Sequence, residues 1–90
     1  IGAKAAWDRG ILGAGVEIAV VDSGVHLTHQ DLVKNLRPGA NFVDPSKPPQ
    51  DDECSNDDCG HGTHVAGIAA ASIDDGGSVG VAPRAGIVPL

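Results

Sequence analysis

The sequence predicts an α/β fold with a central parallel sheet and flanking helices, of which these 90 residues form an incomplete N-terminal part. Two observations predict this class. Short apolar runs rich in β-branched residues, typical of strands in parallel sheets, occur at Val16–Val21 and from about Ala85 to Leu90. Segments with helical character alternate with these runs, and that order favours parallel pairing of the strands.

In the first half of the chain the sequence predicts a helix, a strand and two shorter elements. Ala3–Arg9 is composed of good helix formers, and the glycine that follows suits the position just past a helix end. Val16–Val21 predicts a strand buried on both faces. Further along, His29–Leu32 indicates a turn or a short helix, and Asn41–Val43 a short strand.

The second half begins with a loop. Asp44–Asp58 is rich in proline and acid, which predicts a surface loop. A helix is expected from about Gly62 to Ser72, because the helix-breaking residues Asp74–Gly77 follow it. The last apolar run, Gly86–Leu90, has the character of a strand that no helix or neighbouring strand follows. We therefore expect residues 1–90 to be the front part of a larger domain.

Composition and net charge limit the kinds of partner and the classes of protein that fit this sequence. The hydrophobic fraction is 41%, supplied mostly by small residues, and Trp7 and Phe42 are the only aromatics, so a core built from this chain alone would be thin. The net charge of -6 argues against nucleic acids and anionic membranes as partners. No apolar run has transmembrane length. No signal-peptide pattern opens the chain, although a mature chain would also lack one.

Two cysteines, Cys54 and Cys59, lie close together in the polar loop. Their spacing allows a small disulfide ring, which would indicate an oxidising compartment and a secreted protein. The alternatives are two free surface thiols or a metal site. A Cys-x4-Cys-x-His-x2-His cluster made with His61 and His64 would suit tetrahedral zinc, although the spacing differs from that of common zinc modules.

The segment Gly60–Gly67 packs two histidines and three glycines into eight residues, a composition poor for a core and costly for a helix. Upstream, Asp22 ends an apolar run and lies where functional groups gather in open α/β sheets, beyond the carboxyl end of a strand. Such a carboxylate can accept the Nδ1–H of an imidazole and stabilise its charged form. The structural alternatives are an Asp22 that only caps a turn and a His61 that is merely solvated.

Together these segments resemble the Asp and His elements of the subtilisin-like serine proteases (subtilases), and the resemblance runs along the whole chain. Four segments carry it: Val20–Gly24, Thr28–Leu32, His61–Gly67 and Gly80–Pro83. The match of His61–Gly67 to the family's His motif is highly specific. The resemblance implies a subtilisin-like fold, with residues 1–90 as the N-terminal part of a peptidase catalytic domain.

The resemblance also implies a mechanism, which is hydrolysis of peptide bonds by an Asp-His-Ser triad. Asp22 and His61 are its expected catalytic members, and His64 is expected to be a structural, hydrogen-bonding residue. None of the serines in this sequence lies in the motif that surrounds the nucleophilic serine of the family. They are Ser23, Ser46, Ser55, Ser72 and Ser78. The remainder of the catalytic domain, or a second chain, must supply the nucleophilic serine, so the segment alone should be inactive. The alternatives are an inactive subtilase-like binding protein and, third, a small Cys/His zinc module.

Calcium is the cofactor that the resemblance implies, in a structural role, and no organic cofactor is expected. Some family members hold calcium with an acid from the Asp-Leu stretch and with the loop after the His helix. Asp31 matches the acid of that stretch. The loop after the helix departs from the family pattern in sequence, but it could add the Asp74 side chain and backbone carbonyls as the oxygen ligands that calcium prefers, so the candidate ligands are Asp31, Ser72, Asp74, Gly76 and Ser78. A separate acidic cluster, Asp51, Asp52, Asp57 and Asp58, suggests either another cation site or, as favoured, a solvated loop. The expected partners are protein or peptide substrates.

Overall fold

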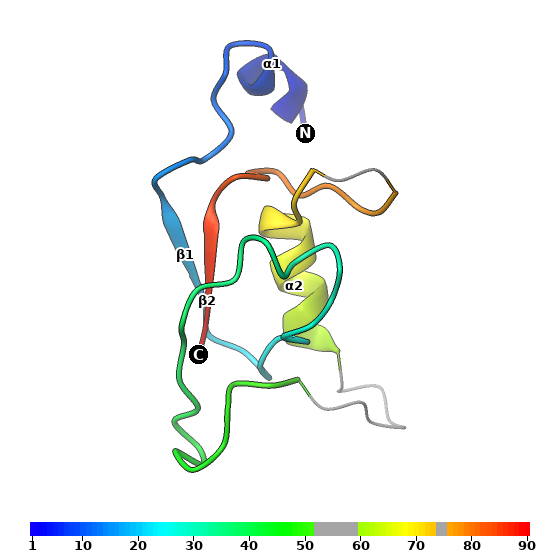
Figure 1. Ribbon diagram of the computed structural model, residues 1–90. Coiled ribbons are helices and arrows are strands. Elements are labelled where there is room, and N and C mark those ends of the chain that lie inside the picture. Colours follow the sequence, from blue (N-terminus) through cyan, green and yellow to red (C-terminus); the bar gives the residue numbers. More distant parts are fainter. Residues whose placement is uncertain (52–59, 74–75) are drawn as a thin grey trace.

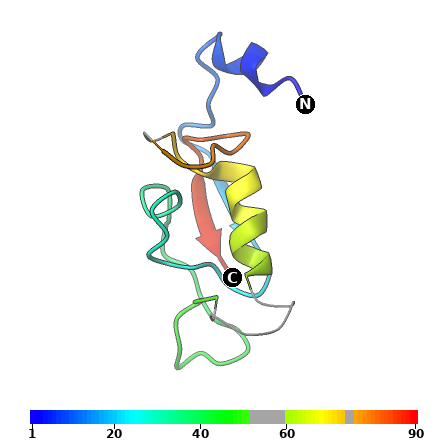
Figure 2. The same ribbon diagram turned by 90° about the vertical axis from the view of Figure 1, so that its right-hand side faces the viewer.

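The structure is a computed structural model, and it describes residues 1–51, 60–73 and 76–90. Its elements are α1 (Ala3–Trp7), β1 (Glu17–Val20), α2 (His61–Ala70) and β2 (Gly86–Pro89). The two strands lie side by side and α2 packs along them, with its N-terminus at the end where the strands finish (Figures 1 and 2). This β1–α2–β2 order confirms the predicted α/β class.

The two strands pair in parallel, with a register that runs from Glu17 opposite Gly86 to Val20 opposite Pro89. The ladder continues past the strands, because Leu90 N–H donates to the Val20 carbonyl at 3.0 Å and Asp22 N–H donates to the Leu90 carbonyl at 3.2 Å. The backbone of Asp22 is therefore fixed by the sheet, although Asp22 itself lies outside the strand.

The core lies between the sheet and α2 and is made of small and branched side chains. Its buried members are Val20, Val25, Leu32, Ala66, Ala70, Ala71, Ala85 and Ile87. Alanines on α2 keep the helix close to the strands. A buried asparagine, Asn35, completes this core by donating from Nδ2 to the carbonyl oxygens of Ala70 (2.9 Å) and Pro83 (2.8 Å). It thereby ties the C-terminal end of α2 to the segment that enters β2.

Helix α1 lies at the far end of the molecule from the N-terminus of α2 (Figure 1). None of its residues is buried. Its side-chain tether is Trp7, whose indole Nε1–H donates to the carbonyl of Val81 at 2.9 Å. This element is therefore an appendage that does not shape the opposite end of the sheet.

Three expectations from the sequence need correction. Asn41–Val43 is not a strand, because Asn41 Oδ1 accepts the N–H groups of Val43 (3.0 Å) and Asp44 (2.8 Å) and bends the chain. The helix ends at Ala70 rather than Ser72, since both the N–H and the hydroxyl of Ser72 donate to the Asp31 carbonyl. Finally, β1 is not buried on both faces. Its residues alternate between exposed and covered positions, because α2 covers one face.

Candidate active site

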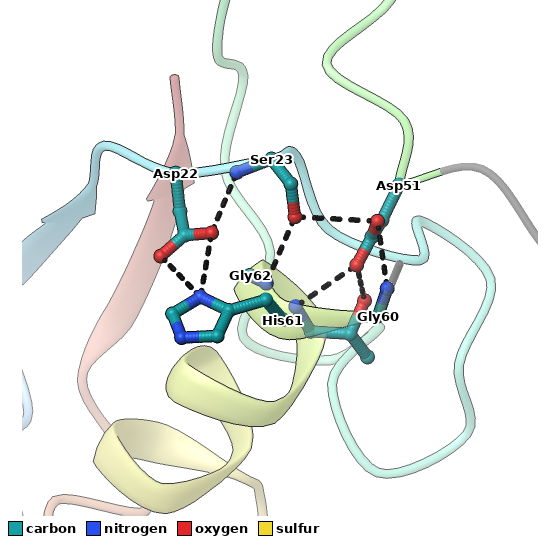
Figure 3. A network of polar contacts seen from close by, with 7 residues as sticks. Asp22, Ser23, Asp51, Gly60, His61 and Gly62 are labelled. Carbon is teal, nitrogen blue, oxygen red and sulfur yellow. Dashed lines mark hydrogen bonds and ion pairs between the residues drawn. The ribbon is translucent and has the colours of Figure 1, made fainter. Parts of the chain in front are cut away.

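Asp22 and His61 face each other across the gap between the end of β1 and the start of α2. His61 Nδ1 lies 2.9 Å from both Asp22 Oδ1 and Asp22 Oδ2. The other ring nitrogen is on the side of the imidazole turned away from the carboxylate (Figure 3). The His61 side chain is 67% exposed and that of Asp22 is 19% exposed. The structure thus brings together two residues that are 39 positions apart in the sequence.

The Asp22 carboxylate is held in its ionised form. Its hydrogen bond with His61 and a second one from the backbone N–H of Ser23, at 2.7 Å to Oδ1, lower the pKa of Asp22 below its ordinary value of 3.8. The carboxylate thus binds both the backbone of the next residue and the imidazole of His61. A charged acceptor of this kind fixes the imidazole with its Nδ1 protonated and favours the imidazolium form.

Two glycines allow the strand exit and the helix start to approach closely. Gly24 has φ +97°, and a Cβ there would lie 2.8 Å from the Pro49 carbonyl oxygen and 2.9 Å from the Asp51 nitrogen. At Gly62 a Cβ would overlap the Gly24 carbonyl oxygen and lie 3.1 Å from Ser23 Oγ. Both positions require the absence of a side chain, so close backbone contact explains Gly24 and Gly62.

A second carboxylate belongs to this site, although in the sequence it is one acid among several in a proline-rich loop. Asp51 is 5% exposed and accepts hydrogen bonds from Ser23, Gly60 and Thr63 (Figure 3). Burial alone would raise the pKa of Asp51, but these hydrogen bonds outweigh it and lower the pKa below 3.8. The favoured interpretation as a solvated loop residue is wrong for Asp51. The other three acids of that cluster lie outside the described residues.

The second histidine of the motif has a different environment. His64 is exposed and borders a cavity of about 500 Å³ on the outer side of α2, together with Asp31 and Ser78. Within the described part of the chain its imidazole has no hydrogen-bond partner, so the structural role predicted for it remains a prediction. Neither Asp22 nor His61 lines this cavity.

The residues expected to hold calcium are partly assembled. Asp31 is 7% exposed, and its Oδ2 accepts the N–H of Ser78 at 3.1 Å, while Ser72 binds its backbone carbonyl. Asp31 Oδ1 is buried and has no hydrogen-bond partner among the described residues. A carboxylate oxygen left in this state suits a bound cation. Asp74 lies outside the described residues.

Other expectations also fall outside the described ranges. Cys54 and Cys59 do so, hence the predicted disulfide and the alternative zinc cluster stay predictions. Among residues 1–51, 60–73 and 76–90, no group of three or more His, Cys, Asp or Glu side chains is placed to hold a metal ion. The same ranges contain no helix with the length and apolar character needed to cross a membrane.

Comparison with known proteins identifies the family of the chain. The model of the Subtilase family matches residues 13–90. The major intracellular serine protease of Bacillus subtilis is 40% identical over 82 residues, which are 91% of this chain and 25% of that protein. An alkaline protease of Alkalihalobacillus alcalophilus is 49% identical over 83 residues, or 92% of this chain and 20% of that protein.

A solved structure is similar as well. The serine protease of Aeromonas sobria, crystallised in complex with its chaperone ORF2, superimposes with a TM-score of 0.75 at 45% identity. The match covers 88% of this chain and 13% of that one. The chain thus spans about a quarter of the length of the curated relatives, or less.

Proposed function

The chain belongs to the subtilase family, and from this premise we propose that residues 1–90 are the N-terminal part of the catalytic domain of a serine endopeptidase. In this proposal the segment contributes Asp22 and His61 to the triad, and the rest of the domain contributes the nucleophilic serine. The observation that carries the proposal is the contact of His61 Nδ1 with both carboxylate oxygens of Asp22 at 2.9 Å.

The proposed chemistry follows from the orientation of the ring. With Nδ1–H donated to Asp22, the Nε2 atom of His61 carries the lone pair that accepts the proton of the serine hydroxyl as its oxygen attacks a peptide carbonyl. The same nitrogen then returns the proton to the leaving amine. Asp22 keeps the tautomer and stabilises the imidazolium that forms between these steps. The ionised state of Asp22, supported by its lowered pKa, is the state that this role needs.

Covalent labelling of the complete protein tests the proposal. A fluorophosphonate should label one serine outside residues 1–90, and His61→Ala and Asp22→Asn should each slow that labelling by about a hundredfold or more, since removing triad members costs roughly 10⁴–10⁶ in turnover. Asp44→Asn is the matched control, because Asp44 is bound within its own loop by Ser46. An unlabelled wild-type protein that still binds polypeptides would instead identify an inactive binding relative.

We also propose a structural calcium ion at Asp31. The buried Oδ1 of Asp31 supports it. Ser72 and Ser78, which both hydrogen-bond to Asp31, are further candidate ligands, together with Gly76 and Asp74 of the same loop. The ion would neutralise this carboxylate and fix the segment after α2. Thermal unfolding with calcium or with EDTA tests this. Calcium should raise the midpoint of the wild-type protein but not that of Asp31→Asn, whereas equal midpoints in the wild type would refute the site.

We propose secretion and a Cys54–Cys59 disulfide from the spacing of the cysteines. Family membership leaves the compartment open, since one relative is named an intracellular protease. Alkylation before and after reduction, read by mass spectrometry, distinguishes the two states. Two thiols that react without reduction would contradict the disulfide and remove the argument for an oxidising compartment.

A further inference from the structure

Helix α2 begins without a cap of its own. Its N-cap residue is Gly60, in the left-handed conformation with φ 82°, and glycine has no side chain to accept the first N–H groups of the helix. Asp51 replaces that missing cap from a separate loop. Its Oδ1 accepts Gly60 N–H at 3.1 Å, and its Oδ2 accepts Thr63 N–H at 3.2 Å and the Thr63 hydroxyl at 2.7 Å. A negative charge at this end is also favourable for the helix dipole.

The same carboxylate reaches the strand side of the site. Ser23, the residue after Asp22, donates its hydroxyl to Asp51 Oδ1 at 3.3 Å and accepts Gly62 N–H through the same oxygen at 3.0 Å. The N–H groups on both sides of His61 in the chain are therefore bound to Asp51 directly or through one hydroxyl. Figure 3 shows this arrangement, with Ser23 between the two carboxylates.

The position of Asp51 is itself fixed by backbone contacts. Its N–H donates to the Val25 carbonyl at 3.1 Å, and Val25 N–H donates to the Pro49 carbonyl at 3.0 Å, around an isolated bridge between Val25 and Gln50. The carboxylate is thus a buried, ionised group with a rigid support. A group in this state can hold its hydrogen-bond donors in one geometry.

We infer that Asp51 is a positioning residue for the Asp22–His61 pair, an inference that rests on the function proposed above. It does not touch the reacting atoms. It holds the backbone on both sides of His61 and the residue after Asp22, so that Nδ1 and the carboxylate stay within hydrogen-bond distance. Because a misplacement of about 1 Å can cost roughly a hundredfold in rate, loss of this support should appear in turnover rather than in substrate binding.

The test compares Asp51→Asn with Asp44→Asn in the complete protein. An asparagine at position 51 keeps one acceptor but points an NH₂ group at the donors on the other side. With rates normalised to active sites titrated by a fluorophosphonate, we expect kcat per site to fall about 10–100-fold for Asp51→Asn, with KM within about twofold. Asp44→Asn should match the wild type. A merely structural role would reduce the number of titratable sites and leave kcat per site unchanged, which would overturn the inference.

A second readout does not depend on turnover. In protein with ¹⁵N-labelled histidine, the Nδ1–H resonance of His61, assigned by its loss in His61→Ala, should exchange faster with solvent in Asp51→Asn than in Asp44→Asn. Equal exchange in the two variants would refute the inference.

If Asp51→Asn does not fold, Ser23→Ala removes only the relay to Gly62, and we expect roughly a threefold to tenfold loss of kcat per site. A Ser23→Ala enzyme with wild-type kcat and exchange would then refute it. If the wild-type protein has no turnover, the proposed function fails, while the exchange comparison still decides the role of Asp51.

Discussion

Replacing Gly62 with alanine should separate the two effects that a glycine has in a helix. A new methyl group at this position would overlap the Gly24 carbonyl oxygen, and the Gly24 backbone is itself packed against Pro49 and Asp51. Since neither side can yield by a rotamer change, the start of α2 must retreat by on the order of 1 Å. Alanine at Gly67, on the same helix, meets no atom within 4 Å.

The magnitudes follow from these contacts. Overpacking of this kind costs about 1–3 kcal/mol, and weakening the Gly62 N–H bond to Ser23 adds about 1 kcal/mol. The higher helix propensity of alanine returns at most about 1 kcal/mol. We therefore expect Gly62→Ala to lower the free energy of unfolding by about 2 kcal/mol. Gly67→Ala should raise it by about 0.5–1 kcal/mol.

Denaturant unfolding of the complete protein, followed by circular dichroism, measures the difference between the two variants. The retreat of the helix start should also slow turnover in Gly62→Ala, because His61 is the neighbouring residue, while Gly67→Ala should keep wild-type turnover. If Gly62→Ala proved as stable as Gly67→Ala, the close approach of α2 to the Gly24 carbonyl would be refuted, and with it the explanation for this glycine.

Three further perturbations test other parts of the structure. Asn35→Leu removes both donors to the carbonyls that end α2 and precede β2, and should cost about 2–4 kcal/mol in denaturant unfolding; a cost below about 0.5 kcal/mol would contradict the contacts. The lowered pKa values of Asp22 and Asp51 mean that their ionised forms stabilise the fold above the ordinary value of 3.8 and that this stabilisation is lost as pH falls through the lower folded values. The unfolding midpoint should therefore decrease as the pH is lowered below about 4, and this decrease should be less steep in Asp51→Asn. An unchanged slope in that variant would contradict the contribution of Asp51 to the pH dependence. Trp7→Phe deletes the indole bond to Val81, and hydrogen exchange should then quicken in α1 but not in α2, whereas equal exchange in α1 would show that the tether is unimportant.

The elements that sequence predicted well are those with a local cause. The apolar runs before Asp22 and at the C-terminal end favour strands by their composition, and the alanine-rich run after His61 favours a helix. As a result β1, α2 and β2 were placed to within two residues at each end. The strand expected at Asn41–Val43 failed because a side-chain oxygen bends the backbone there, an effect that apolar character does not reveal. The extra helical turn to Ser72 failed because a distant carbonyl, that of Asp31, captures its donors.

The residues of the candidate site also differ in whether a local sequence pattern predicts them. Asp22 and His61 could be found because each lies in a short motif whose residue types suit proton transfer. Asp51 could not, since in sequence it is one acid among several in a proline-rich loop. The bridge between Val25 and Gln50, 25 residues apart, holds the residue before Asp51 beside the segment that follows β1. One signal was present in retrospect: Gly60 cannot cap α2, so some other residue had to accept its first N–H groups.

That missing cap has a consequence for how the site is controlled. Asp22 is anchored by the parallel ladder through Val20 and Leu90, and changes in the loop leave this anchor intact. His61, by contrast, stands on a helix end whose donors are bound by a carboxylate from elsewhere in the chain. Disturbing the backbone at Pro49–Asp51 should therefore move the histidine more than the aspartate. The geometry of the pair depends on that loop as much as on the two residues that form it.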